Sequence, residues 1–177
     1  RAWIALGVLG AVQGATVIPL YLMGRSILRV VTKPGDAQLL AGALALLGQF
    51  GALTITEFGT TYYDNVMAGF ALAGLAIIVC NRDALRGGSL RNAALLSALA
   101  GLITGMAMGL KLPAMPWCVG FAAALLAVGG SWKHIAVRLI AGGVAGVIGC
   151  AIFAAPWMLH VYELTGNPLF PYFNAYW

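Results

Sequence analysis

Two ionisable side chains, Asp64 and Lys111, stand at the ends of apolar stretches in a chain that has few charges. Asp64 opens the stretch "DNVMAGFALAGLAIIVC" and Lys111 follows the stretch "GLITGMAMGL". A carboxylate at a helix start either caps the helix or faces a polar cavity, where it can position a hydroxyl or a divalent cation. A lysine at membrane depth either extends its ammonium to the interface or binds an anion such as a phosphate. The residue types leave both alternatives open at each position.

Further polar residues lie near these two. Glu57 precedes the aspartate by seven positions and either shares its cavity or faces water. Tyr63 belongs to a tyrosine pair that fits an aromatic belt at the membrane interface or a wall against which a sugar stacks. The closing segment "LTGNPLFPYFNAYW" is either a membrane-surface loop or a lid over a cavity. The candidate catalytic residue is therefore Asp64, and the candidate substrate-binding residues are Lys111, Glu57, Tyr63, Asn167 and Glu163.

The composition indicates which elements position these residues. Only 8% of the residues are charged and 62% are hydrophobic, which is typical of an integral membrane protein. A helix needs about 20 apolar residues to cross a bilayer. The sequence therefore predicts an all-α transmembrane helix bundle with six spans, at residues 3–24, 37–56, 66–81, 92–110, 113–131 and 136–159. We expect one domain over residues 1–177, a fragment of a larger membrane protein, with outer loops at 57–65, 111–116 and 160–177.

The positive charges predict the orientation of this bundle. They gather in alternate connections between the predicted spans, at Arg25, Arg29, Lys33, Arg82, Arg86, Arg91, Lys133 and Arg138. Because lysine and arginine concentrate on the cytoplasmic side of membrane proteins, these connections are predicted to be cytoplasmic. The net charge of +5 is thus explained without a nucleic-acid partner. Asp64 and Lys111 fall on the opposite, periplasmic face of what we expect to be a bacterial inner membrane.

Glycines recur at helical spacing in two of the predicted spans. Gly101, Gly105 and Gly109 lie four residues apart, and Gly142 and Gly146 repeat the spacing later in the chain. Small residues in a row allow two helices in a membrane to approach closely. The pattern predicts tight packing inside one bundle, with homodimerisation as the alternative.

The cysteines show no arrangement typical of a metal site. Cys80, Cys118 and Cys150 lie in or at the ends of apolar runs, without the spacings of metal ligands. We expect them to act as small buried hydrophobic residues.

The order of three stretches resembles the GT-C superfamily of membrane glycosyltransferases. The stretches are "YYDNVMAGFALAGLAI", a basic turn and "LAGLITGMAMGLKLPAMPW", and the closing "TGNPLFPYFNAYW" is similar to a segment found in many members. More narrowly, they are similar to the bacterial protein-mannosyltransferase and aminoarabinose-transferase type. Where that type has Thr-Lys before the outer face, this chain has Leu110-Lys111.

The resemblance implies an enzyme that transfers a hexosyl or pentosyl group from a polyprenyl-phosphate donor to an acceptor at the periplasmic face. It implies that Lys111 holds the lipid phosphate and that Asp64 lines the active cavity. The main catalytic base of the family would lie upstream of Arg1, so the fragment is expected to be inactive. The expected partners are the lipid-linked sugar donor and the bilayer, and a divalent metal ion is an optional cofactor.

Two other classes of function remain open from the sequence. A transporter or flippase subunit for a lipid-linked or small polar solute would need charges deep in the bilayer or paired broken helices. The sequence shows neither pattern. A purely structural subunit, packed through its glycine faces, would leave Asp64 and Lys111 without a role.

Overall fold

The computed structural model describes residues 2–57, 60, 62, 64–174 and 176, and in these the regular elements are helices. Their bounds are α1 Ala2–Gly14, α2 Val17–Leu28, α3 Pro34–Gln49, α4 Ala52–Glu57, α5 Asp64–Cys80, α6 Arg82–Gly87, α7 Leu90–Leu110, the 3-10 helix η1 Leu112–Ala114, α8 Met115–Ala127 and α9 Trp132–Thr165. The all-α prediction is confirmed for this part of the chain.

Within the described residues, three helical stretches are long and apolar enough to cross a membrane: Trp3–Leu28, Leu90–Leu110 and Trp132–Thr165. Two further apolar helices, α5 and α8, are shorter, with 17 and 13 residues. The predicted span 37–56 is divided at Phe50 and Gly51 between α3 and α4. The predicted span 136–159 is part of a 34-residue helix that continues to Thr165, so the predicted outer loop at 160–177 begins as a helix.

The outer faces of the helices carry large apolar side chains, as a lipid environment requires. In α3 and α9 these exposed residues include Leu39, Leu46, Leu47, Ile140, Val144 and Val147. Soluble monomers rarely expose contiguous apolar surface of this extent. The exposure therefore supports the assignment of the chain as a membrane protein.

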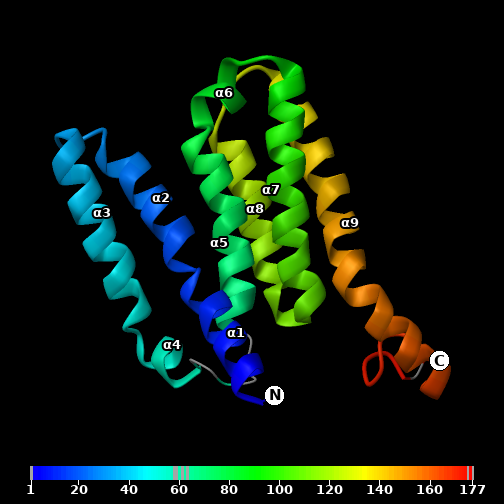
Figure 1. The fold of residues 1–177 in the computed structure, drawn as a ribbon. Helices are drawn as coiled ribbons and strands as arrows, with labels where there is room; N and C mark the ends of the chain where they lie inside the picture. Colours follow the sequence, from blue (N-terminus) through cyan, green and yellow to red (C-terminus); the bar gives the residue numbers. More distant parts are fainter. Residues whose placement is uncertain (1, 58–59, 61, 63, 175, 177) are drawn as a thin grey trace.

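The successive long helices run in alternating directions, so that their connections fall at two opposite ends (Figure 1). The α2–α3 connection, α6 and the α8–α9 connection lie at one end. We call it the basic end, because Arg29, Lys33, Arg82 and Arg86 belong to these segments and Lys133 is in the first turn of α9. The opposite end, which we call the acidic end, holds α4, η1, the start of α5 and the C-terminal segment. The alternation predicted from the charges is reproduced in the arrangement of the helices.

The closest contact in the bundle is between α7 and α9. A Cβ atom on Gly101 would overlap the Gly142 carbonyl oxygen, and one on Gly105 would overlap that of Gly146. Gly109 in turn lies against the Cys150 carbonyl. The glycines at four-residue spacing are thus in contact within the chain. The structure therefore favours packing inside one bundle over homodimerisation through the same face.

At the basic end, Arg138 differs from the sequence prediction. The charge pattern groups it with the basic connections, although position 138 already falls within the predicted span 136–159. The structure places Arg138 inside α9 with its side chain fully buried. Its guanidinium donates hydrogen bonds of 2.6 Å to the carbonyls of Leu85 and Gly129. Gly129 and Gly130 have positive φ values of 70° and 100°, which a tight turn requires. Arg138 therefore joins α9 to α6 and to the turn before α9.

We predict that Gly149→Ala destabilises the chain, whereas Gly143→Ala in the same helix does not. A methyl group at position 149 would overlap the Leu102 carbonyl oxygen, but at position 143 no atom lies within 4 Å of the added carbon. Overpacking of a close contact costs about 1–3 kcal/mol. Unfolding in detergent, followed by circular dichroism, measures the difference. Equal stability of the two variants would contradict the proposed α7–α9 contact.

Candidate functional site

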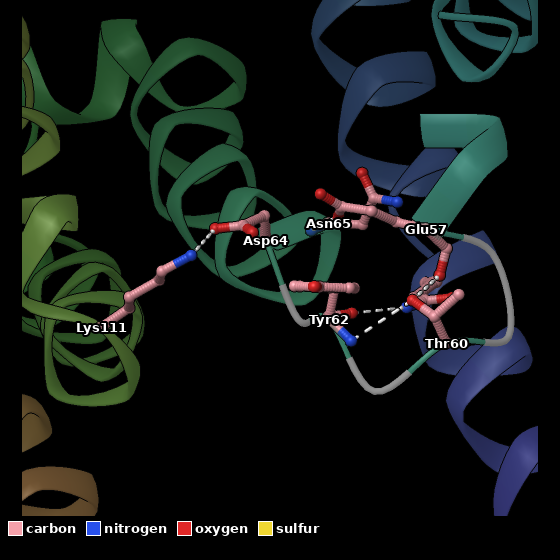
Figure 2. Close-up of polar contacts among 7 residues, drawn as sticks. Glu57, Thr60, Tyr62, Asp64, Asn65 and Lys111 are labelled. Atoms are coloured by element: carbon pink, nitrogen blue, oxygen red, sulfur yellow. Dashed lines mark hydrogen bonds and ion pairs between the residues drawn. The ribbon is translucent and has the colours of Figure 1, made fainter. Parts of the chain in front are cut away.

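Asp64 and Lys111 form an ion pair at the acidic end of the bundle. The Lys111 Nζ atom lies 2.5 Å from the Asp64 Oδ1 atom, and the two side chains are 37% and 36% exposed. Figure 2 shows the lysine extending from the end of α7 toward the first residue of α5. Residues 47 positions apart in sequence are therefore joined where α5 begins and α7 ends. An ion pair with this exposure contributes about 0–1 kcal/mol to stability, so the fold does not depend on it.

The ends of the two helices explain where these charges lie. At Lys111 the backbone leaves the helix with φ −156° and ψ 117°, two residues before Pro113 in η1. Proline lacks an amide hydrogen and cannot continue the α7 hydrogen-bond pattern. Asp64 is in the first turn of α5, where the helix dipole stabilises a negative charge. The helix dipole and the ion pair thus both stabilise this carboxylate, while the Asn65 amide at the helix start is bonded to Glu57.

Glu57 lies close to this site but has a structural role in it. Its Oε2 atom accepts a hydrogen bond of 3.2 Å from the backbone N–H of Asn65, one of the amides at the start of α5. Asn65 also donates to the Thr54 carbonyl at 3.2 Å, and Thr60 donates to the Glu57 carbonyl at 2.7 Å. These bonds tie α4 to the beginning of α5 (Figure 2). The sequence left open whether Glu57 lies at the site or faces water. The structure shows its carboxylate beside the site, bonded to the Asn65 amide.

Two polar residues of the first helices were missed by the sequence analysis. Gln13 is fully buried and donates a hydrogen bond of 3.1 Å to the Tyr62 carbonyl, two residues before Asp64. Thr16 donates to the Gln49 Oε1 atom at 3.1 Å, at the break between α1 and α2. In the sequence, Gln13 could have been recognised as the one amide side chain within the apolar stretch 3–24. The Gln13 bond anchors the segment that leads into Asp64, and the Thr16 bond joins the break between α1 and α2 to the end of α3.

The remaining predicted site residues lie elsewhere or outside the described residues. Tyr63 is not among the described residues. Glu163 is exposed near the end of α9. Asn167 is 2% exposed, and its Nδ2 atom donates to the Tyr172 carbonyl and to Asn174 Oδ1, both at 2.8 Å. Asn167 therefore organises the C-terminal segment, and its amide is used within that segment.

An apolar cavity of about 470 Å³ lies between α7, α8 and α9. Glycine and alanine form much of its wall, and the larger residues around it include Met108, Phe121, Leu125 and Met158. Met108 is three positions before Lys111, so one end of the cavity approaches the site. Among the described residues, no three His, Cys, Asp or Glu side chains come together as a metal site. The structure thus gives no set of ligands for the optional divalent ion.

Comparisons with protein-family models, with curated proteins and with solved structures found no match to this chain. The site is therefore interpreted from its own geometry and from the residue patterns of the sequence.

We predict that Gln13→Leu loosens the segment before Asp64, because it removes the donor to the Tyr62 carbonyl. The loss of one such bond costs about 0.5–1.5 kcal/mol. Hydrogen–deuterium exchange at the start of α5 should become faster than in the wild-type chain. Gln38→Leu, at an exposed position of α3, is the matched control and should leave the exchange unchanged. Protection at the start of α5 that is equal in both variants would refute the anchoring role of Gln13.

Proposed function

We propose that this chain is the membrane part of a glycosyltransferase that takes a sugar from a polyprenyl-phosphate donor at the periplasmic face. The observation that carries the proposal is the Asp64–Lys111 pair. It puts a cation that can bind a lipid phosphate next to a carboxylate that can bind an acceptor hydroxyl. The same two positions carry the resemblance to GT-C transferases in the sequence.

The distribution of charge supports a specific role for Lys111. Among the described residues, the other lysines and arginines belong to α2, to the α2–α3 connection, and to α6, the start of α7 and the start of α9, toward the basic end. Lys111 lies at the acidic end, against this distribution. A lysine serving only solubility or orientation would be expected among the other cations. An ammonium group near headgroup depth suits a mobile lipid phosphate, because it binds without a fixed two-point geometry.

The proposal includes an orientation in the membrane. We infer that α1–α2, α3, α5, α7, α8 and α9 each pass through the bilayer, with the basic end in the cytoplasm. At a rise of about 1.5 Å per residue, α3, α5 and α8, with 16, 17 and 13 residues, are shorter than the hydrocarbon core of about 30 Å. Local thinning of the bilayer, or burial of their ends among the longer helices, accommodates them. Asp64 and Lys111 then face the periplasm.

The chemistry of sugar transfer gives each side chain a role. When the bond between the sugar and the phosphate breaks, negative charge develops on the departing lipid phosphate. A fixed ammonium at that position stabilises the transition state more than the ground state, which lowers the barrier. The neighbouring carboxylate can orient the acceptor hydroxyl and accept its proton. Asp64 is the ion-pair partner of the Lys111 ammonium. A bound phosphate would replace the Asp64 carboxylate in that role.

The orientation predicts which positions are reachable from outside the cell. In a background without native cysteines, Tyr162→Cys at the end of α9 should react with a membrane-impermeant maleimide in intact bacteria. Asp83→Cys in α6 should react only after the membrane is opened. Both native residues are exposed in the structure, so access rather than burial decides the result. Labelling of position 83 in intact cells would reverse the proposed orientation.

The phosphate role predicts a selective loss of lipid binding in Lys111→Met. A hydrogen bond to a charged group contributes about 1.5–3 kcal/mol, which corresponds to a loss of about 10- to 100-fold in affinity. Binding of polyprenyl phosphate to the chain in detergent micelles or nanodiscs measures it. Lys133→Met, at an exposed position of the basic end, is the matched control and should bind as the wild type does. Unchanged binding in Lys111→Met would leave the lysine with interfacial anchoring alone.

A further inference from the structure

Three sulfur-bearing residues from three helices line the cavity between α7, α8 and α9. The Cys118 Sγ atom of α8 lies 3.6 Å from the Met108 Sδ atom of α7. Cys150 of α9 lines the same cavity. We call Met108, Cys118 and Cys150 the sulfur cluster. A fourth sulfur side chain, Met158, also lines the cavity.

Sequence spacing could not reveal this cluster, because its members are brought together by helix packing. The close contact between α7 and α9 holds Gly109 against the carbonyl of Cys150, directly beside Met108 in sequence. Two of the three sulfur-bearing residues are therefore fixed relative to each other by backbone contact. Cys118 joins them near the start of α8. Fixing the backbones in this way lowers the conformational entropy that the site loses when it binds a ligand.

We propose that the sulfur cluster binds one monovalent soft metal ion, of the class of Cu(I). Thiolate and thioether ligands select Cu(I), whereas carboxylates and carbonyls suit magnesium, calcium and manganese. Besides the two thiols, Thr104 supplies the one hydroxyl side chain among the residues that line the cavity. The wall thus offers soft ligands and hardly any hard ones. The proposal does not depend on Asp64 or Lys111.

The observed distance suits a shared ion. With metal–sulfur bonds of about 2.3 Å, as zinc forms with thiolates, three sulfur ligands around one ion lie about 4 Å from each other. The contact of 3.6 Å between Cys118 and Met108 is already close to that spacing. A structural zinc site would instead require four ligands in a closed tetrahedron.

The charge balance also favours a monovalent ion. One cysteine loses its S–H proton to solvent and forms a thiolate–metal bond, while the other sulfur atoms bind as neutral ligands. The resulting complex has no net charge, as an apolar wall requires. No electron is transferred in this step. Because one proton leaves for each ion bound, the apparent affinity is expected to rise with pH until the thiol is fully ionised.

The test is a titration of the purified chain in detergent with Cu(I), kept reduced by ascorbate and buffered by a chromogenic Cu(I) chelator. We expect one ion per chain at the site, with sulfur as the neighbour in X-ray absorption. Cys118→Ser and Cys150→Ser should each lower the affinity at least about tenfold, since loss of even an outer-shell partner costs 10- to 100-fold. Met108→Leu should also weaken binding.

Matched controls separate this site from incidental thiol binding. Cys80→Ser removes a cysteine of α5 whose Sγ atom contacts the Leu22 carbonyl, and Met115→Leu removes an exposed methionine of α8. Both should bind the ion as the wild type does. Circular dichroism and size-exclusion chromatography confirm that each variant keeps its fold. Binding that is absent in the wild type, or that survives in Cys118→Ser/Cys150→Ser, would overturn the proposal. Binding that is lost in Cys80→Ser would overturn it as well.

Discussion

The contact between α7 and α9 positions the helix that carries Lys111. Glycines at 101 and 105 of α7 lie against the backbone of Gly142 and Gly146 in α9, without side chains between them. In a membrane, where burial of apolar surface does not drive helices together, such backbone contact is a principal source of association. Helix α5 lies along α7 through Gly74 at Thr104, α2 packs on α5, and α3 packs on α2. The position of Lys111 follows from the α7–α9 contact, because α7 carries the lysine at its end.

The two ends of the bundle use charge in different ways. At the basic end, a buried arginine, Arg138, binds two carbonyl groups and joins α9 to neighbouring segments. His134 adds a contact of 2.8 Å to the Gly88 carbonyl in the same region. At the acidic end, the Asp64–Lys111 pair is partly exposed and contributes little to stability. Charge thus holds the structure together at one end and remains accessible to a ligand at the other.

Part of this arrangement could be predicted from the sequence, and the reasons differ between residues. The helical class and the glycine contact followed from composition and from four-residue spacing, which are local properties. The alternation of basic connections correctly grouped the ends of the helices. The burial of Arg138 could not be predicted, because it depends on carbonyl groups of α6 and of the turn before α9 that meet the guanidinium only in the folded chain. The role of Gln13 and the sulfur cluster likewise arise only when separate helices meet.

At the candidate site, too, the sequence predicted the region but not the contacts of each residue. Asp64 and Lys111 were selected one by one for their residue type and position, and the structure brings them to 2.5 Å. Glu57 proved to be a partner of the Asn65 amide, and Asn167 proved to be enclosed in its own segment. Polar residues in an apolar chain were therefore a good guide to the region of the site. Their individual roles depended on neighbours that the sequence does not specify.

The central claim is that Lys111 recognises a phosphate, with Asp64 as its partner when no lipid is bound. The most direct measurement compares the affinity of the wild-type chain for polyprenyl phosphate with that for the uncharged polyprenol of equal length, and repeats both for Asp64→Asn. We predict that the phosphate binds at least about tenfold more tightly than the alcohol. We also predict that Asp64→Asn strengthens phosphate binding alone, because the competing carboxylate is gone. Equal affinity of the wild-type chain for the two lipids would contradict the account.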